Sequence, residues 1–227
     1  MEIGGFQKTS LIDFPGKISA VIFTRGCPFR CPYCHNPQLV DPERYAQIIP
    51  EDQVIRHLQL RKGKLQGVVL SGGEPTAQIG LLRFLEKLAP LGYPVKLDTN
   101  GVYPKILEEA IRRGLVQYLA MDIKAPLSRY HEIVRTPVET AAIAQSVSVI
   151  LGSGLPHEFR TTWATPLLSQ TDLLEIARWI EGCDSWFIQT CRAGHTLESG
   201  FGGSASLSEV EELRAVLLPC RTAWRLR

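Results

Sequence analysis

Three cysteines stand close together near the start of the chain. Cys27, Cys31 and Cys34 are separated by three and then two residues. Soft thiolate sulfur is the protein ligand that suits iron–sulfur clusters. A cubane cluster has four irons, so three thiolates leave one iron without a protein ligand, whereas a cluster that only carries electrons normally has four cysteines. The spacing therefore predicts a four-iron cluster with one iron open to a small molecule.

Two simpler interpretations compete with a cluster. His35 follows Cys34 directly, and three sulfurs with one imidazole nitrogen are an allowed set of ligands for structural zinc. Zinc ligands within one loop are normally about two to four residues apart, so adjacent ligands argue against zinc. The sequence shows no secretion signal, and clustered cysteines in a cytosolic protein are more often metal-binding or catalytic than paired in disulfides.

The elements that must position these cysteines alternate between strands and helices. Short β-branched apolar runs predict strands at residues 18–24, 67–71, 95–99, 118–123, 158–164 and 185–190. Segments with helical periodicity lie between and after them, at residues 51–62, 79–89, 104–113, 137–151, 171–181 and 206–218. Ser208 before an acidic run and Gly114 after two arginines are candidate helix caps. This alternation predicts an α/β fold with a parallel sheet, in one domain that spans residues 1–227.

Six strand–helix units are too few to close an eight-stranded barrel, so we expect an open, partial (β/α)6 barrel. The cysteines follow the first predicted strand, and residues 71–76 (Ser-Gly-Gly-Glu-Pro-Thr) follow the second. Residues 97–101 (Leu-Asp-Thr-Asn-Gly) end the third strand, and residues 121–124 (Met-Asp-Ile-Lys) end the fourth. Reactive groups in β/α barrels gather at the carboxyl ends of the strands, so these four motifs are predicted to meet at one mouth.

Composition excludes several classes of protein. The chain has 227 residues, is 44% hydrophobic and carries a net charge of +2, which suits a folded core without a nucleic-acid or membrane-binding footprint. The basic tail of Arg221, Arg225 and Arg227 is interpreted as a solvated terminus. No apolar run is long enough for a membrane span, so we expect a soluble, cytoplasmic protein.

The motifs together resemble those of the radical S-adenosylmethionine (radical SAM) superfamily. Residues 71–76 resemble its glycine-glycine-glutamate-proline element, and residues 97–101 and 121–124 resemble elements of the glycyl-radical activases. Residues 9–17 (Thr-Ser-Leu-Ile-Asp-Phe-Pro-Gly-Lys) and 35–37 (His-Asn-Pro) are most similar to the anaerobic ribonucleoside-triphosphate reductase activating proteins. The resemblance implies a [4Fe-4S] cluster on Cys27, Cys31 and Cys34, with S-adenosylmethionine chelated to the open iron.

The resemblance also implies roles for individual residues, each with a structural alternative. Tyr33 is expected to stack on adenine or simply to pack in its loop, and Gly72 and Gly73 are expected to allow close ligand approach or to form an ordinary turn. A monovalent cation site lined by Asp98, Thr99 and Asp122 is implied as well, although an ion pair of Asp122 with Lys124 would look the same. Arg160 is expected near the cofactor carboxylate or as an ordinary strand residue. The implied cofactor-binding residues are Tyr33, Gly72, Gly73, Glu74, Asp98, Asn100, Lys124 and Arg160.

The implied function is that of a glycyl-radical enzyme activase, with anaerobic ribonucleotide reductase as partner and flavodoxin or ferredoxin as electron donor. Two alternatives remain: a radical SAM enzyme acting on a small molecule or peptide, and a pure electron-transfer iron–sulfur protein. Residues 189–194 depart from the ending expected in the reductase activases, which leaves the partner open. The loop at residues 194–203 is long enough for a lid, and Cys183, Cys191 and Cys220 are too dispersed to form a second cluster site.

Overall fold

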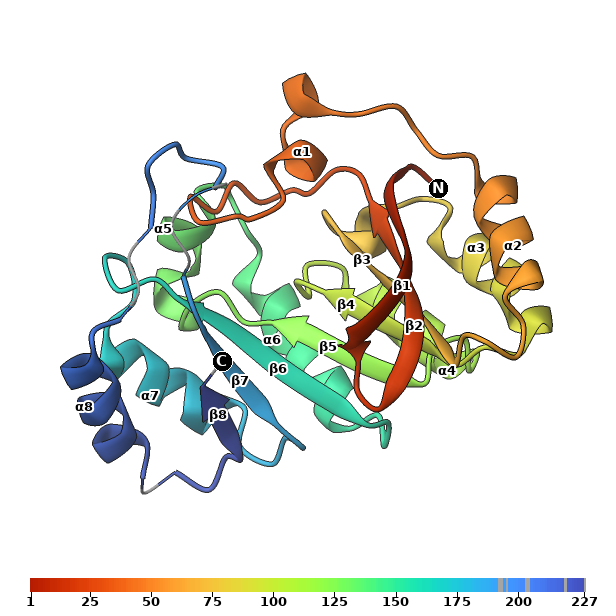
Figure 1. Cartoon of the computed structure of the whole chain (residues 1–227). Helices are drawn as coiled ribbons and strands as arrows, with labels where there is room; N and C mark the ends of the chain where they lie inside the picture. Colours follow the sequence, from red (N-terminus) through yellow and green to blue (C-terminus); the bar gives the residue numbers. More distant parts are fainter. Residues whose placement is uncertain (192–193, 195, 203–204, 219, 227) are drawn as a thin grey trace.

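The protein is built around a single curved sheet of eight strands (Figure 1). The computed structural model describes residues 1–191, 194, 196–202, 205–218 and 220–226. The sheet order follows the chain order, and every neighbouring pair is parallel except β1 and β2. The strands are β1 (Ile3–Phe14), β2 (Lys17–Thr24), β3 (Gly67–Gly72), β4 (Val95–Thr99), β5 (Tyr118–Asp122), β6 (His157–Trp163), β7 (Trp186–Thr190) and β8 (Trp224–Leu226).

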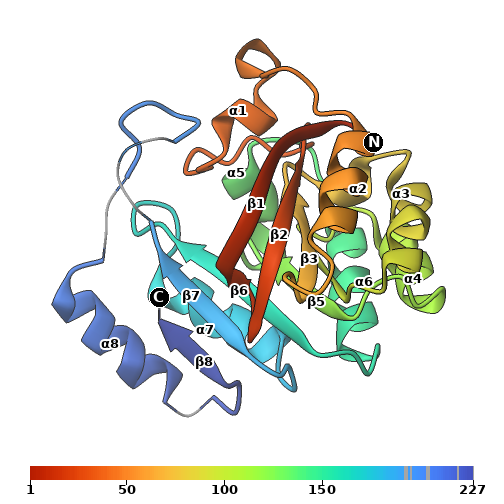
Figure 2. The ribbon, with the colours of Figure 1, turned by 45° about the vertical axis from the view of Figure 1, so that its right-hand side comes forward.

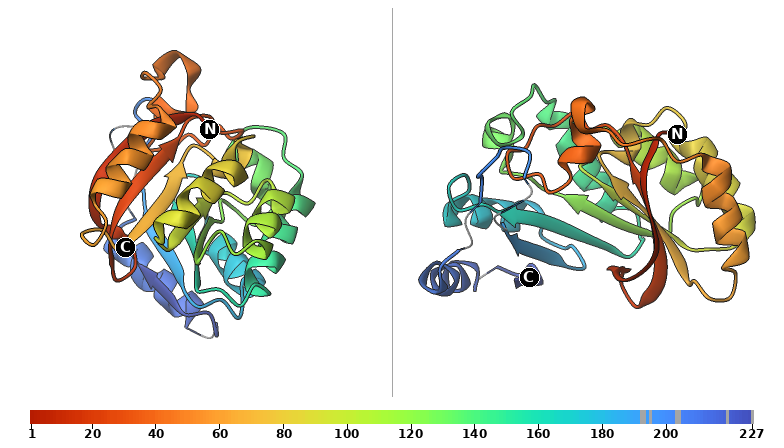
Figure 3. Two further views of the ribbon diagram at one scale, coloured as in Figure 1. Left: turned by 90° about the vertical axis from the view of Figure 1, so that its right-hand side faces the viewer. Right: turned by 45° about the horizontal axis from the view of Figure 1, so that its top comes forward.

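The helices connect successive parallel strands. Figure 2 and the left view of Figure 3 show α2, α3, α4 and α6 together on one side of the sheet. The α-helices are α1 (Pro37–Val40), α2 (Glu51–Leu60), α3 (Leu81–Leu88), α4 (Pro104–Arg112), α5 (Tyr130–Val134), α6 (Thr140–Leu151), α7 (Gln170–Trp179) and α8 (Leu207–Leu217). Four short 3-10 turns add η1 (Pro42–Arg44), η2 (Pro75–Ala77), η3 (Ala89–Leu91) and η4 (Leu127–Arg129). No described helix has the length and apolar character needed to span a bilayer.

The open α/β partial barrel predicted from the sequence is confirmed, with two additional strands. The six predicted strands correspond to β2–β7. The sequence missed β1 because its middle is exposed and polar, as an edge strand tolerates, and it missed β8 because that strand has only three residues. Among the described residues the sheet does not pair β1 with β8, so the barrel stays open.

Capping chemistry fixes several helix ends, and one predicted cap is wrong. Ser206, and not Ser208, is the N-cap of α8, and its side chain and that of Glu209 form a reciprocal capping box. Ser208 lies inside the first turn instead, because the helix begins at Leu207. Gly114 has φ +66° just after α4, which confirms it as the residue that ends that helix.

The two faces of the sheet differ in chemistry. The helix-covered face carries the main apolar core, which includes Leu97 and Phe159. The concave face carries charged residues on the same strands, with Lys96 and Asp98 on β4 and Glu158 on β6. Since side chains alternate along a strand, this pattern directs a polar layer into the interior of the open barrel.

Candidate active site

The cysteine loop joins β2 to α1 and is tied to the rest of the molecule by backbone hydrogen bonds. Gly26 N–H donates to the Leu39 carbonyl at 2.7 Å, and Arg30 N–H donates to the Val134 carbonyl at 2.8 Å. A turn within the loop brings Cys34 N–H to the Cys31 carbonyl at 3.0 Å. In Figure 1 the loop, in orange, lies near α5 and the blue 196–202 segment, beyond the carboxyl ends of the strands. The fold therefore holds all three thiols at the mouth.

The motifs meet in one cavity of ≈ 220 Å³ at this mouth. Every metal-ligating or cofactor-binding residue nominated from the sequence contributes to its lining, which confirms the predicted convergence at the carboxyl ends of the strands. The cavity also includes residues that the sequence did not nominate, among them Ser71, Thr162 and Gln189. The nominated lining residues are Cys27, Cys31, Cys34, Tyr33, Gly72, Gly73, Glu74, Asp98, Asn100, Lys124 and Arg160.

Two nitrogen donors already point at the Cys27 sulfur. The Asn100 side chain amide donates to Cys27 Sγ at 3.6 Å, and the Phe29 backbone N–H lies 3.4 Å from the same sulfur. Burial raises the pKa of the Cys27 thiol to about 12 and that of Cys31 to about 11. Iron must therefore displace a proton from each thiol when it binds, because only the thiolate is a metal ligand.

The donor set fits an iron–sulfur cluster better than zinc. In the described part of the chain, no three Cys, His, Asp or Glu side chains already converge on a single metal position. One zinc ion needs its ligand sulfurs about 2.3 Å from a common centre, whereas each cysteine of a cubane binds a different iron. Sulfurs that share a cavity without sharing a centre, with N–H donors directed at one of them, match the second arrangement.

Gly72 and Gly73 are explained by chain packing as well as by ligand approach. Gly72 has φ +115°, and a Cβ there would lie 2.4 Å from the Thr24 backbone nitrogen. A Cβ on Gly73 would lie 2.1 Å from the Gly26 carbonyl oxygen, directly before the first cysteine. Gly73 N–H also donates to the Thr24 carbonyl at 2.8 Å. The glycines let the loop after β3 lie against the base of the cysteine loop.

Glu74 joins the loop after β3 to the loop after β4. Its buried carboxylate accepts from the Thr99 hydroxyl at 2.7 Å, from the Asn100 N–H at 2.7 Å and from the Thr76 N–H at 2.9 Å. Burial raises its pKa in spite of these donors. Because the contacts of Glu74 are to the protein, it positions Asn100 under the cavity.

A chain of alternating charges crosses the cavity floor. Arg160 donates to Asp122 at 2.8 Å and to Asp98 at 3.2 Å, and Lys124 donates to Asp122 at 3.0 Å. Burial alone would raise the pKa of Asp98 and of Asp122, but the neighbouring cations outweigh it and hold both below their usual range. For Lys124, burial favours the neutral form, yet Asp122 keeps its pKa well above normal.

These ion pairs bear on the implied cation site. Both carboxylates that were expected to line it, Asp98 and Asp122, are engaged by lysine or arginine nitrogens. The structure therefore shows the ion pair of Asp122 with Lys124 that was the alternative to a cation site, and Arg160 forms a second ion pair with Asp122. Lysine and arginine side chains of the chain itself therefore neutralise the charge of both carboxylates.

A second polar layer lies directly beneath and was missed from the sequence. Lys96 is 1% exposed and donates to Asp98 at 2.7 Å, and its Nζ lies 3.6 Å from Glu158. The Tyr118 hydroxyl donates to Glu158 at 3.1 Å. Strand alternation is the sequence signal that could have revealed this layer. Lys96 lies two residues before Asp98 on β4, and Glu158 lies two residues before Arg160 on β6, so each pair points to the same face. This layer fixes the direction of the residues above it.

Tyr33 lies against the covering segment, which we define as residues 196–202. Leu197 N–H donates to the Cys34 carbonyl at 3.0 Å, and Glu198 N–H donates to the Pro32 carbonyl at 3.1 Å. The Phe201 ring centre lies 6.3 Å from that of Tyr33. The Tyr33 hydroxyl is buried and has no hydrogen-bond partner among the described residues, as expected of a group beside a ligand site.

The covering segment is the continuous described part of the predicted 194–203 loop. It packs on the outside of the cysteine loop, while residues 195 and 203 lie outside the described residues. Residues 192 and 193 of the unusual 189–194 ending and Arg227 of the basic tail also lie outside the described residues.

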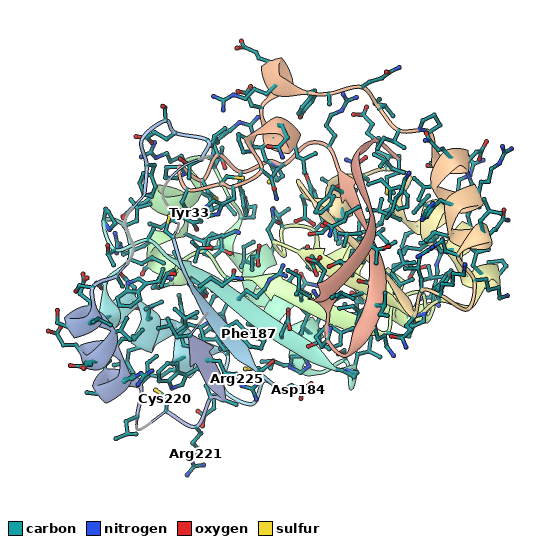
Figure 4. The ribbon with its side chains drawn as sticks, viewed as in Figure 1. Tyr33, Asp184, Phe187, Cys220, Arg221 and Arg225 are labelled. Carbon is teal, nitrogen blue, oxygen red and sulfur yellow. The ribbon has the colours of Figure 1, made fainter. Side chains whose placement is uncertain are left out.

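The remaining cysteines do not line the cavity at the mouth. Cys183 and Cys191 are buried in the main core. Cys220 lines a separate cavity between α7 and residues 220–222, and Figure 4 shows it far from Tyr33. None of the six cysteines, all of which are described, forms a disulfide. Of the six cysteines, only Cys27, Cys31 and Cys34 line the cavity at the mouth.

The fold and the cavity together define the class of protein to which the chain belongs. The model of the Radical SAM superfamily matches residues 21–180, so the chain belongs to the radical SAM superfamily. Members of this superfamily use a [4Fe-4S] cluster and S-adenosylmethionine, and the required three cysteines are present. The predicted superfamily is thus confirmed.

Sequence relatives narrow the class to activating enzymes. The chain is 32% identical over 195 residues to "Putative glycyl-radical enzyme activating enzyme MJ1227" of Methanocaldococcus jannaschii, covering 82% of this chain and 78% of that protein. It is 28% identical to the pyruvate formate-lyase 1-activating enzyme of Escherichia coli K12, over 57% of this chain and 54% of that enzyme. The chain thus spans about half the length of this second relative.

Solved structures with low sequence identity share the fold. SuiB of Streptococcus suis bound to S-adenosylmethionine superposes with a TM-score of 0.69 at 15% identity, covering 91% of this chain and 49% of SuiB. A radical SAM methyltransferase from Sphaerobacter thermophilus gives a TM-score of 0.71 at 16% identity, covering 96% of this chain and 68% of that one. These similarities support the partial-barrel fold, but they support no particular substrate or activity.

The Asn100 contact predicts a shift in the cluster potential. Donors to cluster sulfurs stabilise the more negative, reduced state, so Asn100→Ala is expected to make the midpoint potential more negative. A hydrogen bond contributes about 0.5–1.5 kcal/mol, which corresponds to roughly 20–60 mV for one electron. An anaerobic redox titration followed by electron paramagnetic resonance (EPR) measures the shift.

The matched control for this prediction is Asn36→Ala. Asn36 is the same residue type in the same cavity, and its side chain makes no capping hydrogen bond to α1, so its loss disturbs neither the helix nor the Asn100–Cys27 contact. Equal midpoint potentials for Asn100→Ala and Asn36→Ala would contradict the assigned role of the Asn100 amide.

Proposed function

We propose that this protein generates a glycyl radical on a partner enzyme, and that the partner is an anaerobic ribonucleoside-triphosphate reductase. The observation that carries the proposal is the meeting of three thiols with Asp98, Lys124 and Arg160 in one cavity of an open barrel. The sequence relatives include activating enzymes of the same kind. The choice of the reductase rests on the resemblance of residues 9–17 and 35–37 to its activating proteins.

The residues of the cavity would bind and orient the cofactors. Cys27, Cys31 and Cys34 would hold the cluster, and Asp98, Lys124 and Arg160 would bind the charged groups of S-adenosylmethionine. When bound, the reduced cluster and S-adenosylmethionine supply a 5′-deoxyadenosyl radical, which removes hydrogen from unactivated carbon. The protein's own contribution is binding, orientation and exclusion of competing reactions.

The open side of the barrel suits a protein substrate. The sheet of the described chain does not close, so an extended loop of a partner can reach the cavity from the side. Hydrogen transfer needs reacting atoms about 3–3.5 Å apart, so the target glycine must enter the cavity itself. A reduced flavodoxin or ferredoxin is proposed as the source of the electron.

The test is activation of the reductase in vitro. Anaerobically reconstituted protein, S-adenosylmethionine and reduced flavodoxin or ferredoxin are expected to produce a doublet organic radical on the reductase, measured by EPR. The signal should disappear when the target glycine of the reductase is changed to alanine. A radical that forms on pyruvate formate-lyase but not on the reductase would overturn the assignment of the partner and keep the proposed activity. Deoxyadenosine formation that responds to neither protein but rises with a small metabolite would overturn the activity itself.

A further inference from the structure

A patch of basic side chains lies on the outside of the barrel, where β1 packs against α2. The His57 ring on α2 meets the Phe6 ring on β1 edge to face, with ring centres 5.2 Å apart. The left view of Figure 3 shows the two elements side by side. Basic residues lie on both elements and in the turn that follows α2. The basic patch consists of Lys8, Arg56, Arg61, Lys62 and Lys64.

The chain does not neutralise the charge of the basic patch. Residues 3–12 and 53–73 contain no aspartate or glutamate. Within the described part of the chain, no ion pair involves a side chain of the patch, whereas other surface cations are paired, as Arg113 is with Glu86. Every member of the patch is exposed except Arg61, which is half-buried. The patch therefore presents a positive potential to the solvent.

The cations of the basic patch act together on His57. Burial lowers the pKa of the His57 imidazole, and the positive charges of Lys8 and Arg61 lower it further. Charges from two different elements therefore lie close to one ring. Two buried nitrogens of this region, His57 Nε2 and Arg61 Nε, have no hydrogen-bond partner among the described residues. Since buried polar atoms normally have one, the region lacks both counter-charge and hydrogen-bond partners.

Stabilisation of the helix explains only part of the basic patch. Cations near the last turn of a helix interact favourably with its dipole, which suits Arg61 and Lys62 at the end of α2. This effect falls off within one turn. It therefore leaves Lys8 on β1 and Lys64 beyond the helix unexplained.

The basic patch lies beside the open side of the barrel. Among the described residues the sheet does not pair its first strand, β1, with its last strand, β8, so the opening lies between these two edges. Lys8 belongs to β1, and residues 7–9 in the middle of that strand are exposed. A protein whose loop enters the cavity through the opening lies against an edge strand, and on the β1 side it covers the patch.

We propose that the basic patch is a docking surface for an acidic face of the glycyl-radical partner, which it holds beside the opening while the partner's loop enters the cavity. This inference rests on the proposed function, since it names the surface that receives the same protein substrate. Unpaired cations attract a carboxylate-rich surface and accelerate its association, and salt weakens the effect. The electron donor fits this place less well, because residues 61–66 lead into the amino end of β3, whereas the cysteine loop lies beyond the carboxyl ends of the strands.

The test is the association rate of the reconstituted protein with the partner on which the radical forms. The variants Lys8→Glu, Lys62→Glu and Lys64→Glu each reverse one charge of the patch. The matched control is Lys105→Glu, which reverses one exposed charge on α4. Each patch variant is expected to lower the association rate constant about three- to tenfold at about 0.05 M salt. The difference should shrink to less than about twofold at about 0.5 M salt, where surface charges are screened. Lys62→Arg, which keeps the charge, should retain the wild-type rate.

A second readout separates docking from the chemistry of the cavity. Formation of 5′-deoxyadenosine without the partner should stay within about twofold of the wild type in every patch variant, because the patch shares no residue with the cavity. Normal radical formation by the wild type, with equal association rates for the patch variants and Lys105→Glu, would overturn this inference alone. Slower reduction by flavodoxin or ferredoxin in the patch variants, with unchanged partner association, would also overturn it, because the patch would then receive the electron donor. A wild-type protein that forms no radical on the reductase or on pyruvate formate-lyase would overturn the proposed function and this inference with it.

Discussion

Replacing any one of Cys27, Cys31 and Cys34 with alanine is expected to abolish binding of the four-iron cluster and reductive cleavage of S-adenosylmethionine. In the proposed arrangement each thiolate would bind a different iron, so no remaining cysteine in the cavity could substitute for the one removed. The measurements are iron and sulfide per chain after anaerobic reconstitution, and 5′-deoxyadenosine formed under reduction. Both are expected to fall to the level of the unreconstituted protein.

The control variants are Cys183→Ala and Cys220→Ala. Cys183 is a core residue, and Cys220 lines a cavity that shares no residue with the mouth. Both proteins should reconstitute as the wild type does, although Cys183→Ala is expected to be less stable because it leaves a small gap in the core. Loss of the cluster in Cys183→Ala, Cys191→Ala or Cys220→Ala, with retention in Cys31→Ala, would contradict the ligand assignment.

The position of the site could be predicted from the sequence because parallel strands impose it. Cys27, Gly73, Asp98 and Lys124 are far apart in sequence, but each lies at or just after the carboxyl end of a parallel strand. Once the strand–helix alternation was recognised, their meeting at one mouth followed from the geometry of β/α units. Short, mostly apolar strands between helices are a strong local signal, and β2–β7 were found for that reason.

Features that depend on tertiary contacts could not be predicted in the same way. Strand β1 has an exposed polar middle, so its local pattern resembles a loop until it pairs with β2. The pairing of Lys96 with Glu158 depends on which strands become neighbours across the concave face. The covering segment, residues 196–202, is held by backbone bonds to Pro32 and Cys34, and backbone groups carry no residue-specific signal.

Gly73 was nominated from the sequence for one reason, and the structure adds a different one. The sequence suggested that a residue without a side chain lets the cofactor approach the backbone. In the structure, the space of its missing Cβ is occupied by the Gly26 carbonyl, 2.1 Å away. The glycine is required for contact between two loops of the chain, one of which carries the cluster ligands.

The second large effect is therefore expected from Gly73→Ala, the smallest possible change at that position. A Cβ so close to a backbone atom cannot be relieved by rotating a side chain, so the cysteine loop or the loop after β3 must shift. Overpacking of this kind costs about 1–3 kcal/mol, and here it would displace Cys27 relative to Asn100. We expect lower cluster content and weaker S-adenosylmethionine binding together, measured by iron analysis and by anaerobic equilibrium dialysis. Gly5→Ala is the control, because the nearest atoms to its added Cβ belong to the Phe23 side chain and lie 3.4 Å away, at van der Waals distance. Normal cluster content with selective loss of cofactor affinity in Gly73→Ala would show instead that ligand approach alone requires this glycine.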